Sequence, residues 1–222
     1  MIRDLRFKIL FCVFLYAFIE INANAQYNHI FVFLHKRTDK SELPKEQLDK
    51  LMQGHMANIN RLAKEGKLVA AGPFEGGGGI FIFNSNSIET VKEWLATDPG
   101  VKADRWRVEI QPFYVRIGEV ALVKEPHEMV TYSFVRFTPN IAKFNIQELP
   151  EIFVKHDNYL KQLNRTGNVV GEGIFGDTEG GVLIMKGDVQ SSVFEADPAV
   201  QEGLLQLDVK KLFIAKGAFS EK

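Results

Sequence analysis

The sequence predicts an α+β fold made of two tandem β-α-β-β-α-β repeats whose sheets pack against each other as an intramolecular pseudo-dimer. Three observations lead to this prediction. A set of glycines, histidines and Asp-Pro dipeptides occurs twice at near-constant spacing. The hydrophobic pattern alternates between strand-like runs and helix-like stripes in the same order in both copies. The strand-like runs are apolar on both faces, which an isolated sheet cannot tolerate in water.

The duplication is the strongest of these signals. The interval between the two copies is 101 residues at the histidine, at a glycine and at a phenylalanine, and 99 residues at the closing Asp-Pro. The matched pairs are His55 and His156, Gly72 and Gly173, Phe74 and Phe175, and Asp98 and Asp197. Intervals this constant indicate a duplicated domain. We therefore divide the chain into a leader at 1–25, a first repeat at 26–117, a linker at 118–129 and a second repeat at 130–222.

The elements of the first repeat follow from its local patterns. Strands are expected where apolar residues run continuously, and helices where they recur at three- and four-residue steps. The expected order is a strand at 29–34, a helix at 44–65, strands at 68–74 and 80–83, a helix at 87–96 and a strand at 105–117.

The second repeat shows the same order. We expect strands at 131–137, 169–175, 182–185 and 204–215, a helix that ends near Thr166 and a short helix at 189–195. Pro150 lies only six residues before His156, whereas Pro44 lies eleven before His55. Proline is tolerated only in the first turn of a helix, so the helix that carries His156 is expected to be shorter than the one that carries His55.

The strands at 30–34, 80–83 and 182–185 are apolar in both alternating registers. An antiparallel sheet with one face in water would alternate apolar and polar residues, so both faces must be covered. The helices of a repeat cover one face, and the sheet of the sister repeat is the nearest cover for the other. Each large side chain buried there stabilises the fold by about 1.5–3 kcal/mol, which outweighs the closure of a short linker.

Residues 1–25 have the pattern of a secretory signal peptide. Arg3, Arg6 and Lys8 precede an apolar run at 9–19, and Ala23-Asn24-Ala25 is a small-x-small cleavage site. The run is too short to span a bilayer stably, although a retained N-terminal helix is the alternative interpretation. Cleavage after Ala25 would remove Cys12, the only cysteine, so we expect a periplasmic or secreted chain without disulfides or a stable membrane span.

The charge balance argues against a nucleic-acid partner. The full chain has 27 Lys and Arg against 28 Asp and Glu, and removal of the leader leaves 24 against 26. A slightly acidic chain without a basic run lacks the electrostatic footprint that nucleic acid requires.

The candidate catalytic residues are His55, Asp98, His156 and Asp197. Each histidine falls on the apolar stripe of its helix, and each Asp-Pro follows the second helix on the same sheet face. The aspartate could accept one imidazole N–H and leave the other nitrogen free as a base. Alternatively, each histidine is a satisfied core residue, and each aspartate bonds local backbone N–H groups before its proline. Both interpretations remain open at this point.

At these residues the chain resembles the YCII-related family, within the dimeric α/β-barrel (ferredoxin-like) superfamily. The resemblance rests on the histidine of the first helix, on Gly72-Pro73-Phe74 and Gly173-Ile174-Phe175, and on Asp-Pro after the second helix. The second copy departs from the pattern at Ile174 and in its shorter first helix. The resemblance implies a His-Asp active site and a barrel-like dimer for which this chain supplies both halves. Related enzymes of the superfamily resemble muconolactone isomerase.

The leading functional hypothesis is a cofactor-independent lyase or isomerase that acts on a small organic acid or lactone, with His55 as proton shuttle and Asp98 as its orienting partner. The alternatives are a small-molecule-binding module without turnover, and a structural protein in which His and Asp lock helix to helix. One His and one Asp per site are too few for a structural metal cage, so no metal is expected. An apolar sheet face left uncovered would also favour self-association.

The leader generates the first prediction. We expect the exported protein to begin at or close to Gln26, because signal peptidase cuts after a small-x-small triplet. Mass spectrometry of the exported protein measures this directly. An intact Met1 in a cytosolic fraction would contradict it.

Overall fold

The computed structural model describes residues 29–124, 127–140, 147–176 and 180–220. The predicted signal peptide at 1–25 lies outside these residues. Among the helices in the described part of the chain, none combines the length and the apolar character that crossing a membrane requires.

The first half of the described chain contains four strands and three helices. They are β1 (His29–Lys36), α1 (Lys45–Lys64), β2 (Leu68–Pro73), β3 (Gly79–Phe83), α2 (Ile88–Leu95), α3 (Pro99–Lys102) and β4 (Trp106–Ile117). The second half follows the same order with β6 (Met129–Pro139), α4 (Leu149–Asn164), β7 (Val169–Phe175), β8 (Gly181–Lys186), α5 (Ser191–Glu195), α6 (Pro198–Gln201) and β9 (Leu205–Ala215). A small pair, β5 (Glu119–Val120) and β10 (Phe219–Ser220), lies beside them. The expected elements agree with these bounds to within a few residues.

The helix ends follow the local sequence. Pro44 is the N-cap of α1, and Pro150 lies in the first turn of α4, so α4 has 16 residues against 20 in α1. The shorter helix in the second half is thus confirmed. One detail differs from the sequence prediction, because each Asp-Pro begins a separate short helix instead of ending the previous one. Asp98 and Asp197 are the N-caps of α3 and α6, where an aspartate followed by proline is favoured.

The strands form one antiparallel sheet of eight strands in the order β2-β3-β1-β4-β7-β8-β6-β9. The halves join where β4 pairs with β7. The sheet curls until its two edge strands meet, with a bridge between Phe74 and Leu212 and a hydrogen bond of 2.9 Å from the Glu75 N–H to the carbonyl oxygen of Lys211. The mixed helix and strand content with one large antiparallel sheet agrees with the predicted α+β class.

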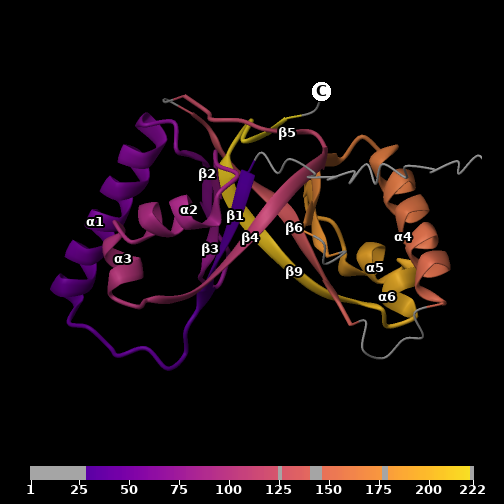
Figure 1. Cartoon of the computed structure of the whole chain (residues 1–222), viewed down its shortest axis with the longest axis horizontal. Helices are drawn as coiled ribbons and strands as arrows, with labels where there is room; N and C mark the ends of the chain where they lie inside the picture. Colours follow the sequence, from indigo (N-terminus) through magenta and orange to yellow (C-terminus); the bar gives the residue numbers. More distant parts are fainter. Residues whose placement is uncertain (1–28, 125–126, 141–146, 177–179, 221–222) are drawn as a thin grey trace, which may run out of the picture.

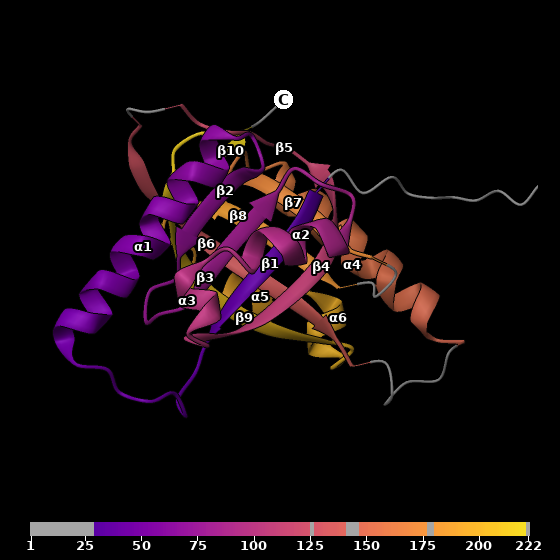
Figure 2. The ribbon, with the colours of Figure 1, turned by 60° about the vertical axis from the view of Figure 1, so that its left-hand side comes forward.

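The helices lie on the two outer sides of this sheet (Figure 1). The first-half helices α1, α2 and α3 lie together on one side, and α4, α5 and α6 lie on the other. When the molecule is turned, α2 and α3 come in front of β1 and β3 (Figure 2). Each half therefore covers the outer face of its own strands.

Three apolar clusters fill the layers. Two of them lie under the helices, one in each half. The third is central and takes side chains from both halves, including Phe31 and Phe113 of the first and Phe134 and Phe175 of the second. The ring centroid of Phe31 lies 5.1 Å from that of Phe113 and 5.3 Å from that of Phe175. The prediction that both strand faces are buried is confirmed, and all five residues of β3 are buried.

The repeated glycine has a packing role at the two seams. A Cβ on Gly173 would lie 2.4 Å from the Phe113 ring, and a Cβ on Gly72 would lie 2.5 Å from the carbonyl oxygen of Phe213. Both distances are below the closest approach of real Cβ atoms. Only glycine therefore lets β7 approach β4, and β2 approach β9, at this distance.

An ion pair links the halves beside the central cluster. Arg136 on β6 donates two hydrogen bonds to Glu109 on β4, from Nη1 to Oε2 at 3.0 Å and from Nη2 to Oε1 at 2.5 Å. The guanidinium also lies 4.2 Å from the ring centroid of Phe33. His35 Nε2 lies 2.7 Å from Glu109 Oε2. Burial raises the pKa of Glu109, but the hydrogen bonds from Arg136, Gln111 and His35 outweigh it, and the net pKa is about 2.

This pair generates the second prediction. A folded pKa below the ordinary value of 4.5 means that Glu109 stabilises the fold above pH 4.5 and loses that contribution as the pH falls through about 2. Glu109→Gln should lower the free energy of unfolding at neutral pH by about 2–3 kcal/mol and flatten the acid limb of the stability curve.

Urea unfolding between acidic and neutral pH measures both effects. Asp208→Asn is the matched control, because Asp208 forms an exposed ion pair with Lys210. This substitution should lower the free energy of unfolding by about 0.5 kcal/mol or less. Equal pH profiles for the two variants would contradict the prediction.

Candidate active site

The structure brings the four predicted site residues together as two separate pairs. His55 on α1 places its Nδ1 2.9 Å from Asp98 Oδ2 and 3.0 Å from Oδ1. His156 on α4 places its Nδ1 2.6 Å from Asp197 Oδ2. All four residues are buried. The spacing of His and Asp in the sequence thus predicted both contacts correctly.

Each aspartate also caps the short helix that it begins. Asp98 Oδ1 accepts hydrogen bonds from the N–H groups of Gly100 at 2.8 Å and Val101 at 3.1 Å. Asp197 Oδ1 accepts one from the N–H of Ala199 at 2.9 Å. The two interpretations of these aspartates are therefore compatible, since one carboxylate caps a helix and orients an imidazole at the same time.

The first pair belongs to a longer polar network. Asn58 donates to Asp98 Oδ2 at 3.1 Å, and Arg61 donates to Asn58 Oδ1 at 2.8 Å. Burial raises the pKa of Asp98, but the hydrogen bond and charge of His55, with further bonds from Val101 and Asn58, outweigh it, and the net pKa lies below its usual value. Asp98 is therefore a carboxylate at neutral pH, held in place by several donors.

Aromatic rings enclose the imidazole of the first pair. The ring centroid of His55 lies 4.8 Å from Trp106 and 5.9 Å from Phe81. Trp106 is the first residue of β4 and pairs with Lys36 at the end of β1. Leu205 is the first residue of β9 and pairs with Pro139 at the end of β6, so it holds the matching place in the second half. The matching place in the second half thus carries a smaller side chain, and Tyr159 stands where the first half has Asn58.

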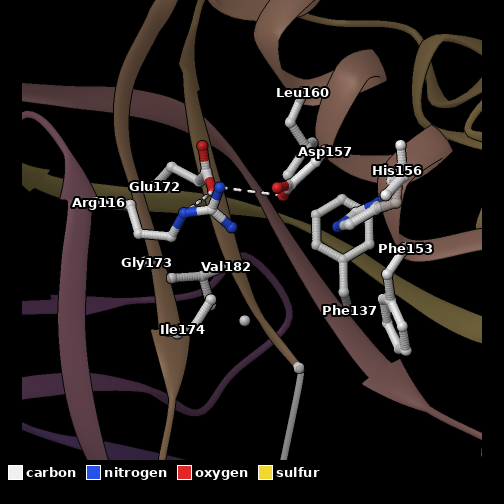
Figure 3. Close-up of a pocket in the computed structure, with 13 residues that line it drawn as sticks. Arg116, Phe137, Phe153, His156, Asp157, Leu160, Glu172, Gly173, Ile174 and Val182 are labelled. Carbon is white, nitrogen blue, oxygen red and sulfur yellow. Dashed lines mark hydrogen bonds and ion pairs between the residues drawn. The ribbon is translucent and has the colours of Figure 1, made fainter. Parts of the chain in front are cut away.

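The second pair lies beside a cavity of about 250 Å³. His156 is part of its wall, and Figure 3 shows the imidazole next to Phe137. Apolar walls come from Phe137, Phe153, Val154, Leu160, Ile174 and Val182, and charged groups from Arg116, Asp157 and Glu172. A second cavity, of about 580 Å³, is lined by Lys36, Arg37, Thr38, Asp39, Val101, Asp104, Trp106, Arg107 and Val108, and His55 is not among them.

The charged end of the first cavity joins the two halves of the chain (Figure 3). Arg116 extends from β4 of the first half, and its Nη2 donates to Asp157 Oδ1 on α4 at 3.0 Å. Its Nε lies 3.4 Å from Glu172 Oε1 on β7. Glu172 is 4% exposed, and burial raises its pKa above the usual value although the charge of Arg116 opposes this.

Sequence reasoning missed these three charged residues. A glutamate inside the apolar strand at 169–175 was a signal for Glu172, because a buried charge inside a core strand needs a reason. Nothing in the sequence pattern indicated that Arg116 would reach the second half. Within the described ranges, no group of three or more His, Cys, Asp and Glu residues is placed to hold a metal ion.

A protein-family model matches part of the chain. The model of the YCII-related domain matches residues 30–114, which lie in the first half. Residues 30–114 are thus similar to the family that the resemblance named, and the match covers the first of the two predicted repeats. A comparison with curated protein sequences finds no match.

Among solved structures, the chain is similar to a protein named "Putative monooxygenase" from Fusobacterium nucleatum subsp. nucleatum. The sequence identity is 12% and the TM-score is 0.44, with 85% of this chain and 91% of the other covered.

The network around Asp98 generates the third prediction. Asp98→Asn should lower the free energy of unfolding at neutral pH by about 2–3 kcal/mol, because a buried charged acceptor loses its bonds. The folded pKa lies below 3.8, so this stabilisation is present above pH 3.8 and is lost as the pH falls through the folded value.

Chemical denaturation at several pH values measures the difference. Asp104→Asn is the control, because the Asp104 side chain is 72% exposed. A loss for Asp98→Asn no greater than that for the control would contradict the prediction.

Proposed function

We propose that the cavity in the second half binds a small organic acid or lactone, and that His156 transfers a proton there with Asp197 as its orienting partner. The observation that carries the proposal is the coincidence of a buried His-Asp pair with a cavity of about 250 Å³. That volume suits a small molecule, near the lower end of ordinary ligand sites.

The geometry defines a role for each member of the pair. A neutral imidazole whose Nδ1–H donates to Asp197 keeps its Nε2 as the basic nitrogen. No hydrogen-bond partner of Nε2 occurs among the described residues. The carboxylate fixes the tautomer and stabilises the imidazolium that forms when Nε2 accepts a proton. Asp197 is therefore a positioning residue, and His156 is the group that would contact the substrate.

The reaction class follows from these groups. Nε2 takes a proton from a carbon next to a carbonyl, and the electron pair of that C–H bond moves onto the carbonyl oxygen as an enolate. Return of a proton at another carbon gives an isomer, with no net change in atoms or oxidation state. The apolar walls hold the body of the substrate in a site with little water. In such a site, fixed polar groups stabilise the charge that develops on the enolate and the imidazolium more strongly than they would in water. No cofactor is needed for this chemistry.

The rival function is a binding module that keeps the cavity without turnover. A structural role is favoured for the first pair, His55 and Asp98. There the imidazole packs against Trp106, and Asn58 and Arg61 extend the hydrogen-bond network. We propose that this pair locks α1 to α3.

We further propose that the two halves are tandem ferredoxin-like repeats that form a pseudo-dimer, and that the chain is exported. The matching order of elements, and a strand order in the second half that repeats that of the first across the β4–β7 seam, support the first point. The sequence pattern at 1–25 supports the second.

The fourth prediction compares the two histidines. The probe is α-angelica lactone in deuterium oxide, where proton NMR follows deuteration of the α-carbon. His156→Gln should reduce the catalysed rate on the order of a hundredfold, the usual share of a positioned acid-base group, with a small change in melting temperature. His55→Gln should lower stability by about 1–3 kcal/mol and leave the rate of the folded protein nearly unchanged.

The opposite pattern would move the site to His55. Wild-type protein that binds the lactone by saturation-transfer NMR but does not accelerate deuteration would favour the binding module. Equal rates for wild type and His156→Gln would overturn the proposal.

A further inference from the structure

Glu172 is the least expected residue in the cavity wall. It occupies a buried strand between Gly171 and Gly173, and its residue exposure is 4%. Its Oε1 is buried without a hydrogen bond among the described residues, although Arg116 Nε is 3.4 Å away as an ion pair. A carboxyl oxygen in this state costs stability, because desolvation is not repaid by a hydrogen bond.

The surroundings of Glu172 do not remove this cost. Burial raises the pKa of Glu172, and the charge of Asp157 raises it further. The charges of Arg116 on β4 and His156 on α4 lower it. Arg116 itself is shared, since its Nη2 donates to Asp157. The balance leaves the pKa of Glu172 above the usual value, so its carboxyl retains a proton to higher pH than an exposed glutamate.

Duplication did not copy this carboxyl. Glu172 directly precedes the seam residue Gly173, and the residue before the matching seam glycine, Gly72, is Ala71. The β2–β9 seam therefore folds without a carboxyl at the place that Glu172 occupies beside the β4–β7 seam. The half that has the glutamate is also the half in which the histidine lines the 250 Å³ cavity.

We propose that Glu172 is a second proton-transfer group, which donates a proton to the substrate while His156 accepts one, and that Arg116 is its positioning residue. This inference rests on the proposed function of His156. Enzymes combine acid and base catalysis by placing a proton donor and a proton acceptor in one cavity.

The substrate class follows from two separated proton sites. Nε2 of His156 takes the α-proton of an unsaturated acid or lactone, and the electron pair shifts through the double bond. The carboxyl of Glu172 delivers its proton to the γ-carbon, so the C=C bond moves into conjugation with the carbonyl. His156 is then an imidazolium and Glu172 a carboxylate paired with Arg116. Exchange with water returns one proton to Glu172 and removes one from His156, which restores the resting state.

The first experiment measures the proton on Glu172 directly and is independent of turnover. Carbon-13 NMR of full-length protein labelled at glutamate carboxyls gives the titration, and the Glu172→Gln spectrum assigns the signal. We expect a midpoint above 4.5, the ordinary glutamate value. The midpoint should rise in Arg116→Met and fall in Asp157→Asn. A midpoint at or below the ordinary value would overturn the inference.

The second experiment separates the two proton transfers on α-angelica lactone, whose conversion to the conjugated isomer needs loss of the α-proton and gain of a γ-proton. Glu172→Gln should keep α-deuteration within about threefold of wild type and reduce conversion on the order of a hundredfold. His156→Gln should reduce both. Glu202→Gln, which alters an exposed carboxylate paired with Lys155, is the control and should change neither.

The outcomes distinguish the two proposals. Loss of both activities in His156→Gln with no effect of Glu172→Gln keeps the proposed function and overturns this inference. Wild-type protein without either activity overturns the proposed function on this substrate class and, with it, the proton-donor role of Glu172. If Glu172→Gln does not fold, Glu172→Ala replaces it, because it copies the residue that the first half has at the matching place.

Discussion

The structure depends on one constraint, which is that its strands carry apolar side chains on both faces. Helices cover the outer face within each half, and the inner face is covered only when the two halves close around the central cluster. Phe31 and Phe33 of β1 contact Phe134 and Phe175 across this cluster. The seam glycines and the Arg136–Glu109 pair follow from the same closure, since both lie where strands of different halves approach each other.

Closure also explains why the two similar halves differ in the surroundings of their histidines. The cavity beside His156 is completed by Arg116, which belongs to a strand of the first half. Neither half alone contains the full set of charged groups. A duplicated chain can change one seam without changing the other, whereas a dimer of identical subunits must change both. Glu172 is one such difference, since the matching place in the first half has Ala71, and it puts a buried carboxyl in the cavity wall.

The His-Asp pairs show how one local motif can lie in two different surroundings. Asp followed by Pro begins a short helix, and the same carboxylate accepts an imidazole N–H from the neighbouring long helix. In the first half, further donors and Trp106 enclose the imidazole, which suits a structural lock. In the second half fewer groups surround the pair, and a cavity lies beside it. The motif alone therefore does not determine the surroundings of the imidazole.

The sequence by itself determined the order of elements, the burial of both strand faces and the two His-Asp contacts. These depend on local periodicity, on proline and glycine, and on constant spacing, all of which are visible along the chain. Only the tertiary structure decided which histidine lines a cavity. In the first half Trp106 packs against His55, and in the second half Arg116 reaches Asp157 and Glu172 across the seam to complete the cavity wall. Contacts between side chains far apart in sequence leave no periodic signal, so the position of the cavity follows from packing alone.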